Sequence, residues 1–307
     1  MSQTSFYGHG KLLITGEYLV LQGAEALAVP LRLGQHVQVK KMRGADLHWK
    51  SVRPDGSEWF KGVFSLLDFS AQEATDPEIA AGISKILTAI TRQNPDFLAD
   101  WKGQSVESRL EFNPEWGLGT SSTLIHAMAE WGEAEAFTLL EQTFGGSGYD
   151  LACATSNGPI IFQSTDDEIR ITPVTLNWPF KENIHLVWSG RKQNSRDSVS
   201  SHTSSLKKAS ASLIQGVSTL TQQIEDAPDL ITFIGLLSEH NQLIGNLLQL
   251  DPNPWVPSFP GIIKPLGAWG GDFFMAVSKE DPKEMKEWFI NQGYTTIFSW
   301  KDLVLEG

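Results

Sequence analysis

The chain carries the sequence Pro114-Glu115-Trp116-Gly117-Leu118-Gly119-Thr120-Ser121-Ser122 between a strand pattern and a helix pattern. Upstream, apolar side chains alternate with polar ones at Val106, Leu110 and Phe112, which predicts a half-buried strand. Downstream, apolar residues recur at helical spacing, at Leu124, Ile125, Met128, Ala129 and Trp131. A helix is therefore expected to begin at the hydroxyl cluster that follows the two glycines.

This order of strand, glycine loop and helix start favours anion binding. Glycines let the backbone approach a ligand closely, first-turn N–H groups have no partner inside the helix, and the helix dipole favours negative charge. We predict that phosphate groups bind the loop residues Gly117, Leu118, Gly119, Thr120, Ser121 and Ser122. The alternative is a turn that needs these residues only for its conformation. The loop is not a P-loop, because no lysine precedes the hydroxyls.

Two further stretches are rich in glycine. One is Gly8-His9-Gly10-Lys11-Leu12-Leu13-Ile14-Thr15-Gly16-Glu17-Tyr18-Leu19-Val20-Leu21-Gln22-Gly23, and the other is Lys264-Pro265-Leu266-Gly267-Ala268-Trp269-Gly270-Gly271-Asp272. In order and spacing, the three stretches resemble the three motifs of the GHMP kinases, which include galactokinase, homoserine kinase, mevalonate kinase and phosphomevalonate kinase. The stretch Gly146-Ser147-Gly148-Tyr149-Asp150-Leu151-Ala152 resembles the segment that carries the catalytic aspartate in the mevalonate and phosphomevalonate branch.

The resemblance implies an α+β, two-domain GHMP kinase fold. Residues 1–177 would form the ATP-binding N-terminal domain, which is ribosomal protein S5 domain 2-like in this family. Residues 178–307 would form the C-terminal domain, which is ferredoxin-like. The resemblance also implies an ATP-dependent phosphotransferase with ATP and Mg²⁺ as cofactors.

The same resemblance assigns catalytic and metal-binding roles to four side chains. Asp150 would accept the proton of the acceptor hydroxyl. Lys11 would keep that carboxylate ionised and stabilise the forming alkoxide, since an opposite charge lowers a carboxylate pKa. Ser121 would be a ligand of Mg²⁺, and Glu141 is the candidate for a second ligand. An ordinary exposed carboxylate on a helix is the alternative interpretation of Glu141.

A further set of residues is assigned to the substrate: Glu17, Tyr18, Ser147, Gly148, Lys192, Arg196, Gly267, Gly270 and Gly271. For Glu17 and Tyr18, buried structural hydrogen bonds are the alternative interpretation. Trp269 stands where the family normally has glycine. It either forms a wall of the site or packs in the core, and the sequence leaves both open.

A serine-rich basic segment follows the predicted start of the second domain. Eight of the eighteen residues from Ser195 to Ser212 are serine, and five basic residues face one acid between Arg191 and Lys208. Such a composition is typical of a flexible loop with solvated charges. In a phosphotransferase we favour a mobile loop that closes over an anionic substrate.

Local signals predict several element boundaries. The first strands are expected to end at Pro30, and Asp76-Pro77 is expected to begin a helix as N-cap and first helical residue. Asp229 and Asp281-Pro282 are expected to begin two later helices.

Length and composition limit the function classes. A chain of 307 residues can form two domains, and its net charge of −12 argues against nucleic acid as a partner. One cysteine allows no internal disulfide. No stretch approaches 18 apolar residues, so we expect a cytoplasmic protein that does not bind a membrane. We allow for a homodimer, although the sequence does not fix the oligomeric state.

The leading hypothesis is a kinase that transfers the γ-phosphate of ATP to a hydroxyl or phosphate of a small anionic metabolite. Mevalonate or phosphomevalonate is favoured, because the first motif and the Gly-Gly-Asp ending are most similar to that branch. Two alternatives stay open: a diphosphomevalonate decarboxylase-like enzyme, and a catalytically silent relative that senses a ligand or binds a protein.

Overall fold

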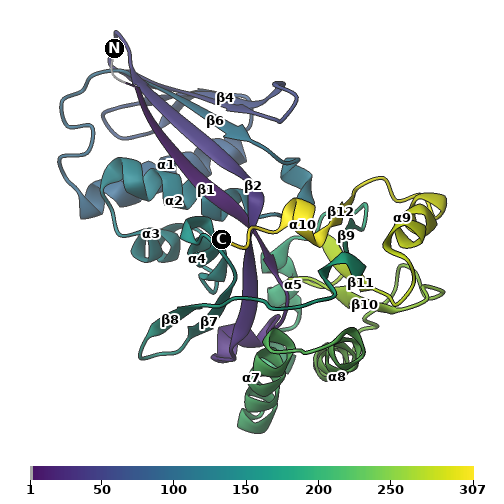
Figure 1. Ribbon diagram of the computed structural model, residues 1–307. Coiled ribbons are helices and arrows are strands. Elements are labelled where there is room, and N and C mark those ends of the chain that lie inside the picture. Colours follow the sequence, from purple (N-terminus) through teal and green to yellow (C-terminus); the bar gives the residue numbers. More distant parts are fainter. Residues whose placement is uncertain (1–2) are drawn as a thin grey trace. The chain divides into compact units, whose positions relative to one another are not determined.

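The computed structural model describes residues 3–307, which form two compact units (Figure 1). The first unit comprises residues 3–10 together with Leu33–Pro114 and Leu118–Thr155. The second comprises Lys11–Arg32, Glu115–Gly117 and Ser156–Gly307. These units follow contacts rather than chain order, so the boundary between residues 177 and 178 stays a prediction. Residues 1 and 2 of the predicted first domain lie outside the described residues.

The first unit is built on a mixed sheet. The strand β2 spans Ala26–Lys41, and its second half pairs antiparallel with β6 (Gln104–Leu110). In turn, β6 pairs parallel with β3 (Asp46–Val52). The antiparallel strands β4 (Glu58–Ser65) and β5 (Ala71–Ala74) extend the sheet beyond β3. The strand β1 (Gln3–Leu13) also pairs with β2.

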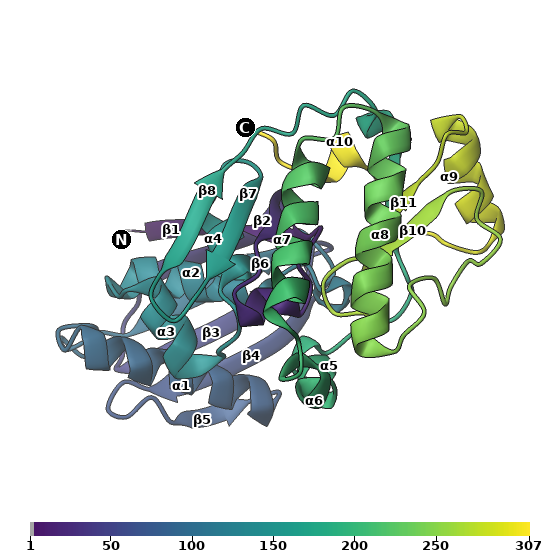
Figure 2. The same cartoon turned by 90° about the horizontal axis from the view of Figure 1, so that it is seen from below.

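Four helices pack with this sheet into one hydrophobic core (Figure 2). They are α1 (Pro77–Gln93), α2 (Thr120–Gly132), α3 (Ala136–Thr143) and α4 (Tyr149–Thr155). The Asp76 carboxylate caps α1 by accepting hydrogen bonds from the backbone N–H groups of Glu78 and Ile79, at 2.9 and 3.1 Å. This confirms the predicted helix start and shows why the sequence could predict it, since the cap is entirely local.

The second unit contains two separate sets of strands. The first half of β2 pairs antiparallel with β7 (Ile160–Ser164), which pairs with β8 (Ile169–Pro173). The other set is a four-stranded antiparallel sheet in the order β10-β11-β9-β12. Its strands are β9 (Ile184–Trp188), β10 (Ile262–Pro265), β11 (Phe273–Val277) and β12 (Ile297–Ser299).

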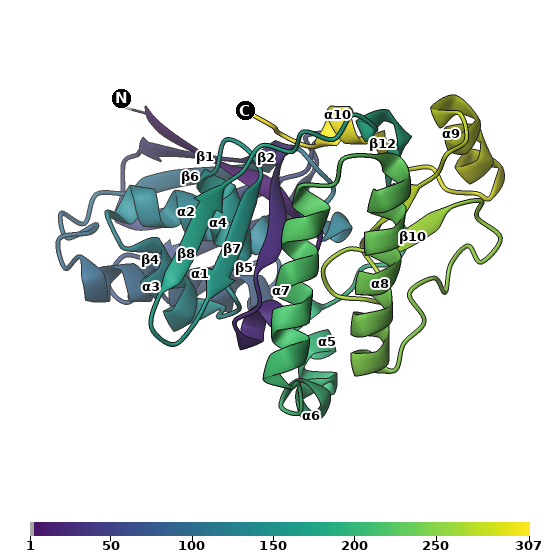
Figure 3. The same cartoon turned by 60° about the horizontal axis from the view of Figure 1, so that its bottom comes forward.

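Two long helices of the second unit, α7 (Ala211–Glu225) and α8 (Leu230–Leu248), lie side by side (Figure 3). Further short helical elements are η1 (Leu19–Gln22), η2 (Pro114–Trp116), η3 (Lys181–Asn183), α9 (Pro282–Asn291) and α10 (Trp300–Leu303). Within residues 3–307, no helix has the length and apolar character needed to cross a membrane.

The serine-rich basic segment is helical, so the prediction of a loop there is wrong. It forms α5 (Ser195–Ser201) and α6 (Thr203–Leu206). The Asn194 side chain caps α5 by accepting from the backbone N–H groups of Arg196 and Asp197, at 3.0 and 3.4 Å. Burial of Ser198 and Leu206 anchors both helices, and composition alone does not reveal that burial.

Candidate active site

The predicted phosphate-binding loop leads directly into α2. Gly119 is the N-cap residue of α2, with a left-handed backbone (φ 101°) and no side chain that could cap the helix. The Ser122 hydroxyl donates a hydrogen bond of 2.9 Å back to the Gly119 carbonyl oxygen, whereas Ser121 is exposed and Thr120 half-buried. The loop therefore presents first-turn N–H groups and two hydroxyls, as anion binding requires.

A buried hydrogen-bond chain fixes this loop to the sheet. The Thr123 hydroxyl donates to the Gln35 side-chain oxygen at 2.5 Å, and the Gln35 amide donates to the Ser108 hydroxyl at 2.6 Å. On β1, a Cβ atom added to Gly8 would lie 3.1 Å from the Thr123 Cα atom. The glycine at position 8 thus allows the first motif to pass directly against the start of α2.

The Asp150 carboxylate lies in the first turn of α4, and α4 packs against α2. Gly148, with φ 92°, leads into α4, and Ser147 lies beside it in the same connecting loop. Lys11 is half-buried on β1 and belongs to the second unit, whereas Asp150 belongs to the first. Their pairing therefore stays a prediction.

The metal-binding assignment also stays a prediction. Glu141 is exposed on α3. Among residues 3–307, no group of three histidine, cysteine or carboxylate side chains is arranged to hold a metal ion. Mg²⁺ usually keeps several waters and needs only one or two protein carboxylates, so a site that uses Ser121 and few carboxylates is compatible with this structure.

Asp272, which ends the third motif, lies close to Gly117 of the central loop. The Asp272 side chain is 8% exposed, and its Oδ1 atom accepts a 2.9 Å hydrogen bond from the Gln193 backbone N–H. A Cβ atom added to Gly117 would lie 2.2 Å from the Asp272 Oδ2 atom, so only glycine leaves room for this carboxylate. Glycine at position 117 therefore allows the Asp272 carboxylate of the protein itself to lie against the loop.

Several charged groups act on Asp272. Burial raises the pKa of its carboxyl group, while the hydrogen bond from Gln193 and the positive charges of Lys11 and Lys192 oppose that rise. The Glu115 carboxylate adds to the rise, and it forms an exposed 3.3 Å ion pair with Lys192. Charged groups of the first motif (Lys11) and the central stretch (Glu115) thus act on a buried carboxylate of the third.

The glycines of the third motif approach the basic segment. A Cβ atom added to Gly271 would lie 2.9 Å from the Arg191 carbonyl oxygen, and one added to Gly270 (φ 113°) would lie 3.4 Å from the Gln193 side chain. Gly267 adopts φ 68° in the same loop. Contacts of these glycines with a substrate stay a prediction.

Glu17 lies in a fully buried polar cluster rather than at a surface. Its carboxylate pairs with the Lys264 ammonium, and both side chains are completely inaccessible to solvent. The Trp269 indole N–H lies 3.4 Å from the same Glu17 oxygen, and His240 Nε2 lies 3.5 Å from the other. His240 Nε2 accepts a 3.1 Å hydrogen bond from the Gly16 backbone N–H.

Tyr18 is likewise held in structural hydrogen bonds. Its hydroxyl accepts from the Trp269 backbone N–H at 2.8 Å and lies 2.8 Å from the Ser198 hydroxyl. Trp269 is buried in a hydrophobic cluster with Tyr18, Leu206 and residues of α7 and α8. The geometry thus places Glu17 and Tyr18 in the structural role that is the alternative to substrate contact, and it gives Trp269 a core role.

The two basic residues assigned to the substrate are exposed. Lys192 pairs with Glu115, and Arg196 lies in the first turn of α5 with its backbone N–H bonded to Asn194. Lys264 and Asp272 were not assigned a role from the sequence, although both lie within the third motif. Charge in a glycine-rich motif was the signal that could have identified them.

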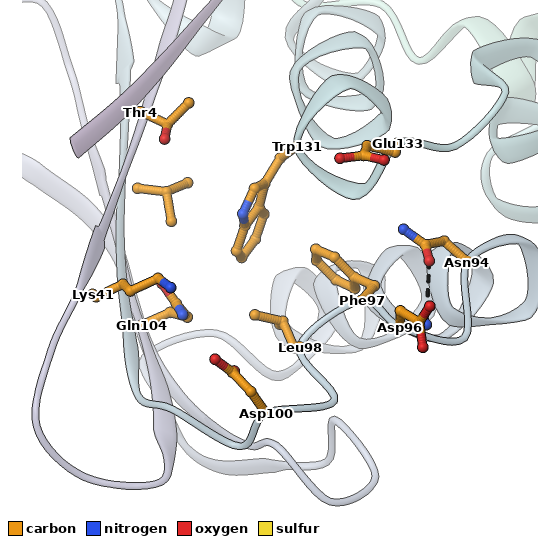
Figure 4. A pocket seen from close by; sticks show the side chains of 11 residues that line it. Thr4, Lys41, Asn94, Asp96, Phe97, Leu98, Asp100, Gln104, Trp131 and Glu133 are labelled. Carbon is orange, nitrogen blue, oxygen red and sulfur yellow. Dashed lines mark hydrogen bonds between the residues drawn. The ribbon is translucent and has the colours of Figure 1, made fainter. Parts of the chain in front are cut away.

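A pocket of about 410 Å³ lies elsewhere in the first unit (Figure 4). The Trp131 and Phe97 rings form part of its wall, with their centroids 4.9 Å apart in an edge-to-face arrangement. Asp96, Asp100 and Glu133 contribute carboxylates around it. Among the described residues, none of the predicted site residues lines this pocket.

Comparison with known proteins identifies the fold. No protein-family model and no curated protein sequence matches the chain. Among solved structures, it is similar to the Methanococcus jannaschii mevalonate kinase, with a TM-score of 0.71, 14% sequence identity and coverage of 100% of this chain and 99% of that one. The chain has the GHMP kinase fold.

Other structures with the GHMP kinase fold align over nearly the whole chain. The Streptococcus pneumoniae phosphomevalonate kinase, in complex with phosphomevalonate and AMPPNP, gives a TM-score of 0.70 at 16% identity and covers 96% of this chain and 99% of that one. The Lactococcus lactis galactokinase complexed with galactose gives 0.64 at 12% identity, covering 100% and 94%. The predicted fold class is confirmed, while the identity of each domain stays a prediction.

Proposed function

We propose that this chain is an ATP-dependent kinase of a small anionic metabolite, with mevalonate or phosphomevalonate as the favoured acceptor. The observation that carries the proposal is the uncapped start of α2 behind Gly119, in a fold shared with mevalonate kinase, phosphomevalonate kinase and galactokinase structures. Phosphoryl transfer depends mainly on positioning and charge stabilisation, and this loop offers both.

The nucleotide phosphates would bind the first-turn N–H groups of α2 and the hydroxyls of Thr120 and Ser121. Gly119 supplies no side chain to compete for those N–H groups. Ser121 and Glu141 are the residues that would hold Mg²⁺, whose charge would neutralise the transferred phosphoryl group. The structure described here holds Ser122 and Thr123 in internal hydrogen bonds, so their hydroxyls act on the loop's shape.

The acceptor would be activated by Asp150 and Lys11. For a hydroxyl acceptor, the Asp150 carboxylate would take the proton, and the Lys11 ammonium would stabilise the oxygen as charge develops on it. A phosphate acceptor is already largely ionised near neutral pH, since its second pKa is about 6, and needs no such base. The dependence on Asp150 therefore distinguishes the two acceptor classes.

The favoured acceptors are anionic. Lys192 and Arg196 are exposed on the segment that approaches Gly270 and Gly271, where they would attract a carboxylate or phosphate. The similar structures include mevalonate kinase and a phosphomevalonate kinase that holds the anionic phosphomevalonate. The galactokinase structure shares the fold and holds galactose, a neutral sugar, so the fold alone does not determine the acceptor.

A panel of acceptors tests the proposal. ADP release would be measured in a coupled assay with ATP and Mg²⁺ against mevalonate, phosphomevalonate, homoserine and galactose, with release of CO₂ from diphosphomevalonate as a parallel reading. We expect ADP release with mevalonate or phosphomevalonate, without CO₂. Release of CO₂ would support the decarboxylase alternative, and ATP binding without turnover on any acceptor would support a ligand-sensing protein.

A further inference from the structure

The third motif holds the start of the serine-rich basic segment in place. The Asp272 backbone N–H donates to the Arg191 carbonyl oxygen at 2.7 Å, and the Gln193 backbone N–H donates to the Asp272 Oδ1 atom at 2.9 Å. Lys192 lies between these two hydrogen-bonded residues. One residue of the third motif therefore fixes the backbone that carries the Lys192 side chain.

Tyr18 of the first motif holds the same segment further along the chain, at α5. Its hydroxyl lies 2.8 Å from the Ser198 hydroxyl and accepts a 2.8 Å hydrogen bond from the Trp269 backbone N–H. Its ring meets the ring of His202, which ends α5, edge to face with the centroids 5.7 Å apart. This one side chain thus joins the first motif, the third motif and the basic segment.

These contacts are shielded from water. Tyr18, Ser198 and Trp269 are all buried, and the Tyr18 ring packs in the same hydrophobic cluster as Leu206 of α6. When one partner of a buried hydrogen bond is deleted, the other is left unsatisfied, so such a bond is costly to break. Loss of the Tyr18 hydroxyl should therefore loosen the attachment of α5.

The backbone of Tyr18 is unusual as well. Its φ angle is +63°, which side chains other than glycine rarely adopt. A strained conformation persists only where the surrounding structure holds it, and such residues cluster at functional sites. Here the burial of the ring and the two partners of the hydroxyl hold it.

Anchoring at Ser198 also determines which side of α5 faces the solvent. Two residues that are two positions apart in an α-helix point roughly 200° apart, since each turn takes about 3.6 residues. With Ser198 on the buried side, Arg196 lies on the exposed side, as the structure shows. The contact of Tyr18 with Ser198 therefore fixes the direction in which α5 presents Arg196.

We propose that Tyr18 is a positioning residue for the anionic acceptor: by holding α5 through Ser198, it fixes Arg196 where the carboxylate or phosphate of the acceptor binds. This rests on the proposed function, which gives Arg196 its role toward the acceptor. Tyr18 acts through Arg196 and touches no reacting atom. A segment that is already anchored loses less conformational freedom when the acceptor binds, so the anchoring raises affinity for the acceptor.

Hydrogen exchange tests the anchoring without any enzyme activity. Mass spectrometry would follow amide exchange in residues 195–206 of the wild type, Tyr18→Phe and Ser198→Ala. We expect exchange in this segment to become about 3- to 10-fold faster in each variant, because a hydrogen bond that holds the segment closed is lost. Phenylalanine keeps the buried ring, so Tyr18→Phe removes the hydroxyl and leaves the packing.

Two comparisons separate this coupling from general destabilisation. The double variant Tyr18→Phe, Ser198→Ala should exchange no faster in residues 195–206 than Tyr18→Phe alone, since the two hydroxyls share one hydrogen bond. Tyr7→Phe is the matched control, because it removes a 2.8 Å hydrogen bond of another tyrosine hydroxyl, to Glu111 in the first unit, and should leave this exchange at the wild-type rate.

Three results would overturn the anchoring. They are unchanged exchange of residues 195–206 in Tyr18→Phe, an equal increase in Tyr7→Phe, and additive increases from the losses of the Tyr18 and Ser198 hydroxyls. Thermal unfolding of each variant would show that the protein remains folded at the temperature of the exchange experiment.

Kinetics test the role of the anchored segment once an acceptor is known. Tyr18→Phe should raise the KM for the acceptor about 3- to 10-fold, while kcat and the KM for ATP stay close to wild type. Arg196→Gln should raise the same KM, and adding Tyr18→Phe to it should have little further effect, because Tyr18 acts through Arg196.

A merely structural role of Tyr18 would lower stability without a selective rise in the acceptor KM, or would add its full effect to that of Arg196→Gln. Either result would overturn the positioning role. If the wild type phosphorylates no acceptor, the proposed function fails, while hydrogen exchange still decides whether Tyr18 anchors α5.

Discussion

The Lys264 ammonium and the Glu17 carboxylate form an ion pair that is completely inaccessible to solvent, although the two residues are 247 positions apart in the chain. The pair joins the first motif to the third. Trp269 and His240 each approach a different oxygen of the Glu17 carboxylate, and both side chains are buried. A buried ion pair contributes little net stability, but it makes the position of each partner depend on the other.

Loss of one partner should therefore be severe. Lys264→Met leaves the Glu17 carboxylate buried without its cation, and we expect the free energy of unfolding to fall by about 3–5 kcal/mol. The double variant Glu17→Gln, Lys264→Met removes both charges and should be more stable than the single Lys264→Met. Urea unfolding of the wild type, both single variants and the double variant measures this coupling. Additive losses would mean that the two side chains do not stabilise one another.

His240 should make stability depend on pH. Burial lowers its pKa from 6.5 to about 3, so between these values the unfolded chain binds a proton that the folded chain does not. Stability is then complete above about pH 6.5 and falls as the pH is lowered, by up to about 1.4 kcal/mol per unit. The Glu17 carboxylate, which is also paired with Lys264, and the Gly16 N–H lie against Nε2 of this ring.

The variant His240→Gln keeps an acceptor for the Gly16 N–H and removes the titrating group. Urea unfolding at pH 5, 6 and 7 should show a smaller loss of stability toward pH 5 in this variant than in the wild type. His48→Gln, at an exposed position on β3, is the matched control and should keep the wild-type slope. Equal slopes in all three proteins would contradict the buried, neutral state of His240.

The elements that the sequence predicts well are those whose signals are local. Asp76, Asp229 and Asp281 each cap a helix through backbone N–H groups two and three residues ahead, as their positions before the helical patterns predict. Gly119 precedes α2 where the glycine loop and the helical spacing after it predict a helix start, although it supplies no side-chain cap. The GHMP kinase fold is predicted by the resemblance of three stretches in their order and spacing, whereas the central loop by itself leaves a conformational turn open.

Features that depend on distant partners could not be predicted. The sequence predicts that a strand ends at Pro30, but β2 continues through Pro30 to Lys41. The Pro30 carbonyl oxygen accepts a 2.9 Å hydrogen bond from the Leu305 N–H, a partner far away in the sequence. Lys264 appears in the sequence as one more charged residue, since its partner is 247 positions away. In the same way, Gly117 resembles a ligand-binding glycine until the Asp272 carboxylate is seen beside it.

Asp150 should matter most when the acceptor is a hydroxyl. Asp150→Asn removes the proposed base and should lower kcat by about 10²–10⁴-fold with an acceptor hydroxyl, while substrate binding stays close to wild type. With an acceptor phosphate, which already carries negative charge, the loss should be much smaller. Steady-state kinetics with each active acceptor, together with calorimetric binding of substrate, measure both effects. Turnover within a few-fold of wild type on a hydroxyl acceptor would remove Asp150 from this role.

Gly117 and Gly145 offer a test of close approach against backbone strain. Both adopt positive φ angles, +70° and +65°, so an alanine at either position pays a similar conformational penalty of about 1–2 kcal/mol. Only at Gly117 does the added Cβ meet an obstacle, the Asp272 carboxylate at 2.2 Å, whereas no atom among the described residues lies within 4 Å of a Cβ on Gly145. Both substitutions therefore carry the conformational penalty, and only the alanine at position 117 adds a steric clash.

Gly117→Ala should accordingly lose more stability than Gly145→Ala, because the Asp272 carboxylate must leave its hydrogen bond with the Gln193 N–H to make room. It should also lower kcat, since a shift at residue 117 disturbs the loop that leads into α2, while Gly145→Ala should leave kcat close to wild type. Urea unfolding and steady-state kinetics on both variants separate the two contributions. If the two alanines have equal effects, the backbone angle alone explains the glycine at position 117, and the contact with Asp272 has no role in stability or catalysis.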